Sequence, residues 1–209
     1  MDGSAVRGER IWDAPFQMRA RNQRSTIFTA FSLWDRDRLT YAQGMALACV
    51  LFDWGDTLMS EDGPAETPMA LWPEVRAIDG AGVVLRILAA RYRIAVATNA
   101  TISDCTSIRR ALARVALDAF VAEIFCFRDL GLKKADARFW DAVVARLAVP
   151  RAQMLMVGDD LDNDVLAPRR AGIASVWLNW KRAPTPAGVV VSRIERLDQL
   201  PSLLAADFA

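Results

Sequence analysis

The sequence predicts an α/β fold, a doubly wound parallel sheet with helices on both faces. From residue 46 onward, apolar runs of strand length alternate with segments of helical period, the pattern of chains that build parallel sheets. The runs are apolar throughout, as expected of strands that are covered on both faces. Polar residues follow four of these runs, which is where ligands bind in such sheets.

The individual elements follow from the same pattern. Five short aliphatic runs are predicted to be strands: 46–53, 93–98, 123–127, 154–159 and 174–179. The intervening segments are predicted to be helices, with a short helix near the end of the chain: 80–91, 103–117, 136–147, 162–171 and 197–205. Residues 45–209 are therefore expected to form one domain.

Residues 1–44 differ from the rest, and we expect a poorly defined N-terminal extension there. Scattered arginines and isolated aromatic residues show no sustained period. Three interpretations stay open: an arm that docks through its aromatic side chains, a nucleic-acid-binding tail, or upstream sequence outside the native start. Met45, directly before the first predicted strand, is consistent with the last. Aspartates interleaved with the arginines disfavour the tail.

Composition excludes several kinds of catalytic site. The chain has no histidine, so Ser-His-Asp and Cys-His catalysis and imidazole-dependent zinc sites are ruled out. The three cysteines, Cys49, Cys105 and Cys126, form no CxxC pair, which argues against a zinc ribbon or a disulfide framework. Carboxylates, lysines and hydroxyl groups remain as candidate catalytic groups.

Charge and hydropathy indicate the partners and the compartment. Twenty-six basic residues balance 25 acidic ones, so no overall field attracts nucleic acid or an anionic membrane, and neither partner is expected. No apolar run reaches the roughly 20 residues that span a bilayer. We expect a cytoplasmic protein, and the sequence leaves homo-oligomerisation open.

Polar residues follow four predicted strands and are expected to meet at one edge of the sheet, because ligands bind at the carboxyl ends of parallel strands. They are the segment 53–58 (DWGDTL), Thr98 with Asn99, Lys134 after Lys133, and the segment 158–164 (GDDLDND).

In this order the four segments resemble the haloacid dehalogenase-like (HAD) superfamily, with its aspartate loop, its Ser/Thr strand end, its lysine and its acidic loop. The resemblance covers about 45–180 and implies a Rossmann-like, HAD-like core. The stretch 131–139 (GLKKADARF) is similar to the family's G-x-x-K-P-D-P segment, with alanines in place of both prolines. That alignment selects Lys134 over Lys133. Each segment alone is weak, and the set of four is specific.

The resemblance implies a nucleophile and a metal site. Asp53 would attack phosphorus and form an aspartyl-phosphate intermediate. A carboxylate can do so only when negative charge is partly neutralised, which calls for a divalent cation, Mg²⁺, and a lysine. The expected metal-binding residues are Asp53, Asp159, the backbone carbonyl of Gly55, and Asp164, the last acting through its neighbours.

Thr98, Asn99 and Lys134 are expected to bind the phosphoryl group. The hydroxyl of Thr98 would donate to a phosphoryl oxygen, and Lys134 would balance charge in the transition state. Each residue also has a simpler interpretation: Thr98 and Asn99 as strand end and helix cap, Lys134 as a solvated lysine, Asp53 as a turn residue, and 158–164 as a helix cap. The prediction of a phosphoryl-binding site fails only if all of these simpler interpretations are true at once.

The first segment departs from the family at Gly55. Phosphatases of the family carry a second aspartate there, which protonates the leaving alcohol and then activates water. Without it, a loss of about 10² to 10⁴ in rate is expected. Asp56, one residue later, stands where the family usually has glycine, and it is a candidate for proton transfer.

About 35 residues separate Thr57 from the strand that begins at Arg93, and a predicted helix uses a third of them. We therefore expect a minimal cap and an open site.

The sequence predicts a magnesium-dependent HAD-type hydrolase, a phosphatase acting on an unidentified phosphorylated substrate. Gly55 supports a second hypothesis, an impaired HAD domain that binds a phosphorylated ligand or partner. Haloacid dehalogenation is a third, and the paired acidic loop disfavours it.

Overall fold

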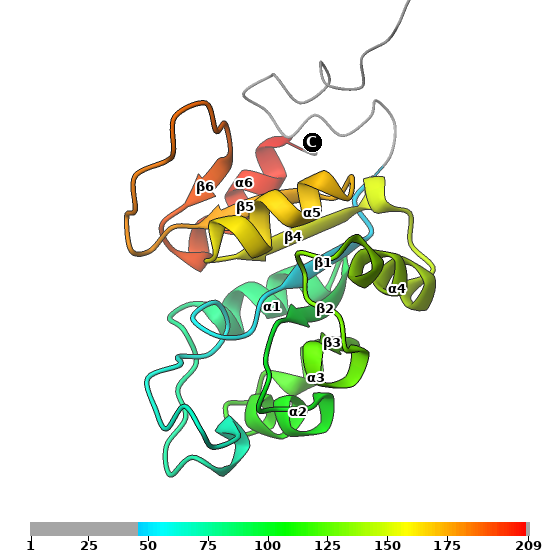
Figure 1. Ribbon diagram of the computed structural model, residues 1–209. Coiled ribbons are helices and arrows are strands. Elements are labelled where there is room, and N and C mark those ends of the chain that lie inside the picture. Colours follow the sequence, from blue (N-terminus) through cyan, green and yellow to red (C-terminus); the bar gives the residue numbers. More distant parts are fainter. Residues whose placement is uncertain (1–45, 208–209) are drawn as a thin grey trace, which may run out of the picture. The chain divides into compact units, whose positions relative to one another are not determined.

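The computed structural model describes residues 46–207. Their centre is a six-stranded parallel sheet in the order β3-β2-β1-β4-β5-β6 (Figure 1). The strands are β1 (Cys49–Phe52), β2 (Arg93–Thr98), β3 (Glu123–Cys126), β4 (Met154–Gly158), β5 (Ala174–Leu178) and β6 (Ser192–Ile194). Helices cover both faces, so the predicted doubly wound α/β fold is confirmed. The extension predicted for residues 1–44 lies outside the described residues.

Five of the strands coincide with predicted apolar runs, and β2 matches its run at both ends. The first run was predicted too long, because β1 begins at Cys49. The sequence did not predict β6, a three-residue strand at the edge of the sheet in which Ile194 is buried, Ser192 is partly buried and Arg193 is exposed. A strand this short carries no periodic signal.

The helices are α1 (Ala81–Ala89), α2 (Cys105–Ala113), α3 (Phe127–Leu130), α4 (Ala137–Leu147), α5 (Ala167–Arg170) and α6 (Leu200–Asp207). The predicted helix 103–117 is too long, because the chain turns after α2 and Ala116 adopts a positive φ of 57°. The predicted helix 162–171 consists of a π-helical segment, Leu161–Leu166, followed by α5. Single-turn α3 was not predicted, because four residues are too few to show a helical period.

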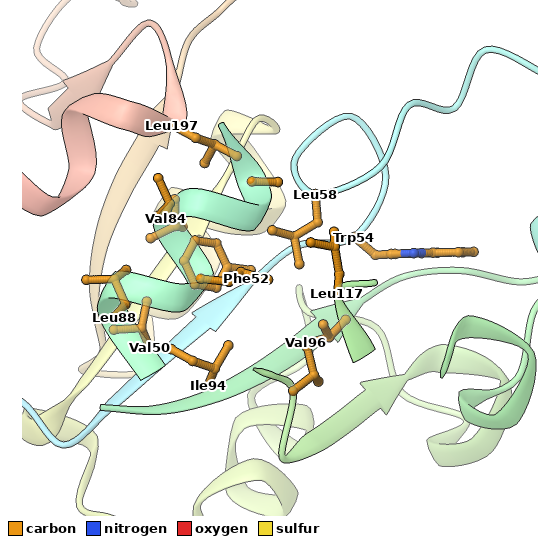
Figure 2. Packing of buried hydrophobic residues seen from close by; sticks show 14 of the residues in the cluster. Val50, Phe52, Trp54, Leu58, Val84, Leu88, Ile94, Val96, Leu117 and Leu197 are labelled. Atoms are coloured by element: carbon orange, nitrogen blue, oxygen red, sulfur yellow. The ribbon is translucent and has the colours of Figure 1, made fainter. Parts of the chain in front are cut away.

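The side chains of β1 alternate between two apolar cores. Val50 and Phe52 belong to the core that contains α1, α2 and α6. Figure 2 shows them beside Ile94 of β2 and facing Val84 of α1. Cys49 and Leu51 belong to the core on the opposite face, which α4 covers. Because both faces are covered, the strand is apolar throughout, as the sequence pattern indicated.

Two aromatic residues anchor α4 on its core. Phe139 and Trp140 are fully buried, and their rings meet edge to face with centroids 5.1 Å apart. The helix begins after Asp136, whose side chain accepts a hydrogen bond from the backbone N–H of Arg138. It ends at Ala148, which has a left-handed conformation.

The strand order reverses direction between β1 and β4, which pair in parallel with Phe52 opposite Val157. The backbone N–H of Asp53 continues the ladder by donating to the carbonyl of Val157 at 2.9 Å. In open α/β sheets this reversal leaves a crevice at the carboxyl ends of the strands, where ligands bind. Asp53 and Asp159 flank it. Among residues 46–207, no helix has the length and apolar character that crossing a bilayer requires.

Candidate active site

Three carboxylates from two neighbouring strand ends converge. Oxygen atoms of Asp53, Asp159 and Asp164 lie within 4.8 Å of one another. Asp53 follows β1, Asp159 follows β4, and Asp164 lies one helical turn further on in the π-helical segment. Asp53 and Asp164 are buried and Asp159 is partly buried. Burial, and then the charge of Asp53, raise the pKa of both Asp159 and Asp164.

Lys134 neutralises two of these carboxylates. Its Nζ donates to Oδ1 of Asp53 at 2.6 Å and makes a short contact with Oδ1 of Asp164. The side chain of Lys134 is only 3% exposed, so these ion pairs lie in a region of low dielectric. Burial by itself lowers the pKa of Lys134, but the charges of Asp53 and Asp164 outweigh it and hold that pKa above its ordinary value. Lys134 is therefore a permanent positive charge beside Asp53.

The backbone of Lys134 is held from both sides. Its N–H donates to Oδ1 of Asn99 at 2.8 Å, and its carbonyl accepts from Nε1 of Trp140 at 2.8 Å. Asn99 follows β2 and Trp140 belongs to α4, so a strand end and a core helix together position the lysine. Asn99 was predicted to bind substrate. The structure places its side-chain oxygen on Lys134.

Thr98 ends β2 and is buried beside the same edge. Its Oγ1 accepts a hydrogen bond from the N–H of Ala100 at 3.3 Å. A hydroxyl that accepts through its oxygen keeps its own hydrogen for a second partner. Thr98 can therefore donate to an anionic oxygen that binds next to it.

The acidic loop after β4 is built by short-range hydrogen bonds. The side chain of Asp160 caps the π-helical segment by accepting from the N–H groups of Asp162 and Asn163. Oδ2 of Asp164 accepts from the N–H of Asp160 at 3.0 Å. A methyl group on Gly158 would lie 2.3 Å from that same oxygen, so only glycine fits there. Both oxygens of Asp164 are thus occupied, which suits a residue that orients its neighbours.

The loop after β1 places Asp56 at the rim of the site. Asp56 adopts a positive φ of 51°, a conformation that favours glycine. Its Oδ1 accepts from the N–H of Glu61 at 3.1 Å, and its Oδ2 lies 3.4 Å from Nζ of Lys181. The same Nζ lies 3.2 Å from Oδ2 of Asp159. Lys181 therefore bridges the first and fourth segments at the rim.

A cavity of about 760 Å³ joins these groups. It is lined by every predicted site residue: Asp53, Gly55, Asp56, Thr98, Asn99, Lys134, Asp159 and Asp164. Seven acidic side chains and two lysines line it, an excess of five negative charges when all are ionised. Such a cavity attracts cations.

The donor set fits a magnesium ion. Mg²⁺ prefers carboxylate oxygens at 2.0–2.1 Å, so two ligands on one ion lie up to roughly 4 Å apart. The spread of 4.8 Å among the three carboxylates is close to this, and a small rotation of Asp53 or Asp159 would close it. Asp53 keeps Oδ2, which has no hydrogen bond within residues 46–207.

Comparison with known proteins identifies the family. The model of the haloacid dehalogenase-like hydrolase family matches residues 65–172, about half of the chain. The chain belongs to this HAD-like hydrolase family. A curated relative is the pyrimidine 5'-nucleotidase YjjG of Escherichia coli (strain K12), 28% identical over 128 residues. That match spans 59% of this chain and 56% of the relative, so the chain spans little more than half the length of that protein.

Solved HAD structures share the fold. The putative HAD-hydrolase YfnB from Bacillus subtilis, bound to magnesium, superposes with a TM-score of 0.65 at 18% identity, over 77% of this chain and 99% of that one. The 2-haloacid dehalogenase from Pseudomonas syringae pv. Tomato DC3000 gives a TM-score of 0.63 at 19% identity, again over 77% and 99%. The recognition of a HAD-like hydrolase from sequence is confirmed.

Two site residues were not predicted, Glu61 and Lys181, and both line the cavity. Lys181 follows β5 by three residues, so the rule that directed attention to polar residues after strands could have found it. Glu61 lies in a loop with no such signal. Desolvation of the carboxyl, and then the charges of Asp53 and Asp56, raise the pKa of Glu61, although the residue as a whole is exposed. The roles assigned to the predicted residues remain predictions.

The segment between β1 and α1 contains a single 3-10 turn, Met69–Leu71, and two isolated bridges, at Gly55–Met59 and Met59–Ala77. Within the described residues, this segment forms no helical lid over Asp53. The minimal cap remains a proposal for the whole protein.

Proposed function

We propose that this HAD hydrolase is a magnesium-dependent phosphomonoesterase with Asp53 as its nucleophile. The observation that carries the proposal is the buried pairing of Asp53 with Lys134 beside Asp159, at the point where the strand order reverses. A nucleophilic carboxylate, a fixed cation and a set of hard oxygen ligands are the groups that phosphoryl transfer requires.

Asp53 and Asp159 would hold the ion, with the carbonyl of Gly55 as a further ligand and Asp164 fixing the loop. When bound, Mg²⁺ supplies the charge neutralisation that lets two anions approach. The remaining steps belong to the chain. A carboxylate oxygen of Asp53 attacks phosphorus, the bond from phosphorus to the ester oxygen breaks, and that oxygen takes a proton and leaves as the alcohol. Water then attacks phosphorus and gives up a proton, the bond from phosphorus to Asp53 breaks, and inorganic phosphate leaves.

Lys134 and Thr98 assist these two reaction steps in different ways. Lys134 orients Asp53 through the 2.6 Å hydrogen bond and balances charge as the phosphoryl group is transferred. Thr98 has a hydroxyl hydrogen left to donate to a phosphoryl oxygen. Asn99, next to Thr98, accepts a hydrogen bond from the backbone of Lys134 and thereby fixes the distance between Lys134 and Thr98.

The test uses wild-type protein and Asp53→Asn with p-nitrophenyl phosphate. We expect turnover by the wild type that requires Mg²⁺, is abolished by a chelator, and is absent in D53N. An acid quench during turnover should leave one phosphoryl group on the peptide that contains Asp53. Because the relative in E. coli is named a pyrimidine 5'-nucleotidase, pyrimidine nucleoside 5'-monophosphates are the first physiological esters to assay.

Two results would replace the proposal. Binding of phosphate esters without turnover of any of them would support the impaired HAD domain, for which Gly55 is the argument. Release of chloride from a haloacid in the presence of chelator would support a dehalogenase, which needs no metal.

A further inference from the structure

A carboxyl group fills the space beside Gly55. A methyl group built on Gly55 would lie 1.9 Å from Oε1 of Glu61 and 2.2 Å from Cδ of Glu61. No atoms can approach so closely, so the carboxyl of Glu61 occupies the volume that a side chain of residue 55 would need. Residue 55 is two positions after Asp53, and both residues line the same cavity with Glu61.

The loop holds Glu61 in this place from two sides. The N–H of Glu61 donates to Oδ1 of Asp56 at 3.1 Å. The preceding residue, Ser60, donates its N–H to the carbonyl of Arg76 at 3.0 Å, next to the bridge between Met59 and Ala77. The backbone of Glu61 is therefore anchored, and its side chain projects back toward Gly55.

The other carboxyl groups near Asp53 are already engaged. Both oxygens of Asp164 accept hydrogen bonds, one from Lys134 and one from the backbone. Asp56 bonds the N–H of Glu61, and both Asp56 and Asp159 contact Lys181. The carboxyl of Glu61 has no hydrogen-bond partner within residues 46–207.

We propose that Glu61 is the general acid and base of this active site, in place of a carboxyl on residue 55. The proposal rests on the phosphomonoesterase function proposed above. In the first step the Glu61 carboxyl gives its proton to the ester oxygen as the bond from that oxygen to phosphorus breaks, so the alcohol leaves neutral. In the second step the Glu61 carboxylate takes a proton from water as the water oxygen attacks phosphorus. The bond from phosphorus to Asp53 breaks, and both carboxyl groups return to their starting states.

In this scheme Asp56 is a positioning residue. Its positive φ and its hydrogen bond to the N–H of Glu61 set the course of the loop. Its carboxylate needs no proton for this task.

The test compares two esters of similar shape whose leaving groups differ in their need for a proton, p-nitrophenyl phosphate and phenyl phosphate. Glu61→Gln keeps the size of the side chain and removes the acid. Glu66→Gln is the matched control, an exposed glutamate of the same segment that does not line the cavity. The variant G55D/E61A places a carboxyl on residue 55 in the space that Glu61 vacates.

We expect E61Q to lose about 10² or more in kcat on phenyl phosphate and less than about tenfold on p-nitrophenyl phosphate. E66Q should match the wild type on both esters. The variant G55D/E61A, with its carboxyl on residue 55, should turn over phenyl phosphate faster than E61A does. Equal melting temperatures of E61Q and E66Q would show that the loss is not a folding defect.

Three results would overturn the assignment of Glu61 while the phosphatase function stands. In the first, E61Q turns over phenyl phosphate at the wild-type rate. In the second, E61Q loses the same factor in kcat on both esters. In the third, the wild type turns over p-nitrophenyl phosphate but not phenyl phosphate. Failure of the wild type to hydrolyse either ester would refute the proposed function itself.

Discussion

Replacing Lys134 by alanine tests the electrostatic centre of the site. The side chain of Lys134 is 3% exposed and bridges Asp53 and Asp164, whose side chains are 11% and 0% exposed. Removing one partner of a buried ion pair costs about 3–5 kcal/mol, because the charge left behind is uncompensated. For a chain of this size each kcal/mol lowers the melting temperature by about 2–4 °C, so K134A should melt roughly 6–20 °C below the wild type.

Thermal unfolding measures the melting temperature and urea unfolding the free energy, both followed by circular dichroism in a buffer that contains a chelator, so that no metal compensates the aspartates. Lys133→Ala is the matched control. Lys133 is exposed, with its Nζ 5.5 Å from the ring centroid of Phe127, and its loss should change stability by less than about 0.5 kcal/mol.

The pH dependence of the difference has a definite sign. The pKa of Lys134 is raised in the folded state, so its contribution is complete below the pKa of a free lysine, about 10.4, and is lost as the pH rises through the folded value. The gap between wild type and K134A should therefore be full at neutral pH and shrink in strong alkali. If K134A were as stable as K133A at neutral pH, the buried ion pairs would not exist as described.

Three further predictions concern the loops around the site. Gly158→Ala should destabilise the fold by about 1–3 kcal/mol in urea unfolding, because the added methyl group displaces Asp164; unchanged stability would contradict this packing. Asp56→Asn should keep turnover of phenyl phosphate while Asp56→Ala loses most of it, since an amide oxygen still accepts from the N–H of Glu61; equal losses would indicate that Asp56 itself transfers the proton. Hydrogen bonds from the side chain and backbone of Arg138 lower the pKa of Asp136 to about 2. Its contribution to stability should therefore be complete above about pH 4 and be lost as the pH falls from there through about 2, and a carboxyl titration by NMR with a midpoint near 4 would refute it.

The sheet could be predicted because strands that are buried on both faces appear in the sequence as continuous apolar runs. Strands covered on both faces are apolar at nearly every position, and β2, β4 and β5 show this over five or six residues each, with Arg93, Thr98 and Ser175 as the polar exceptions. The partly exposed edge strand β6 has no such requirement and carried no signal. The π-helical start of the fourth helical segment also went unseen, since its hydrophobic spacing differs little from that of an α-helix.

The framework of the site could be predicted for a related reason. Asp53, Thr98 and Asp159 are attached directly to strand ends, so the topology of the sheet alone brings them together. Glu61 reaches the same cavity through a turn that depends on the backbone conformation of Asp56 and on a hydrogen bond to Arg76. Such loop paths depend on contacts between distant residues, which local sequence patterns do not reveal.

Magnesium binding tests most directly the claim that the carboxylates after β1 and β4 form one site. Isothermal titration calorimetry would compare the wild type with Asp159→Asn and with Asp160→Asn. Asp160 is the adjacent control, because its side chain caps the following segment and an asparagine can do the same.

We expect one Mg²⁺ per chain in the wild type, affinity weakened by at least about tenfold in D159N, and wild-type affinity in D160N. Unaltered binding by D159N, or no binding by the wild type, would mean that Asp53 and Asp159 do not share an ion.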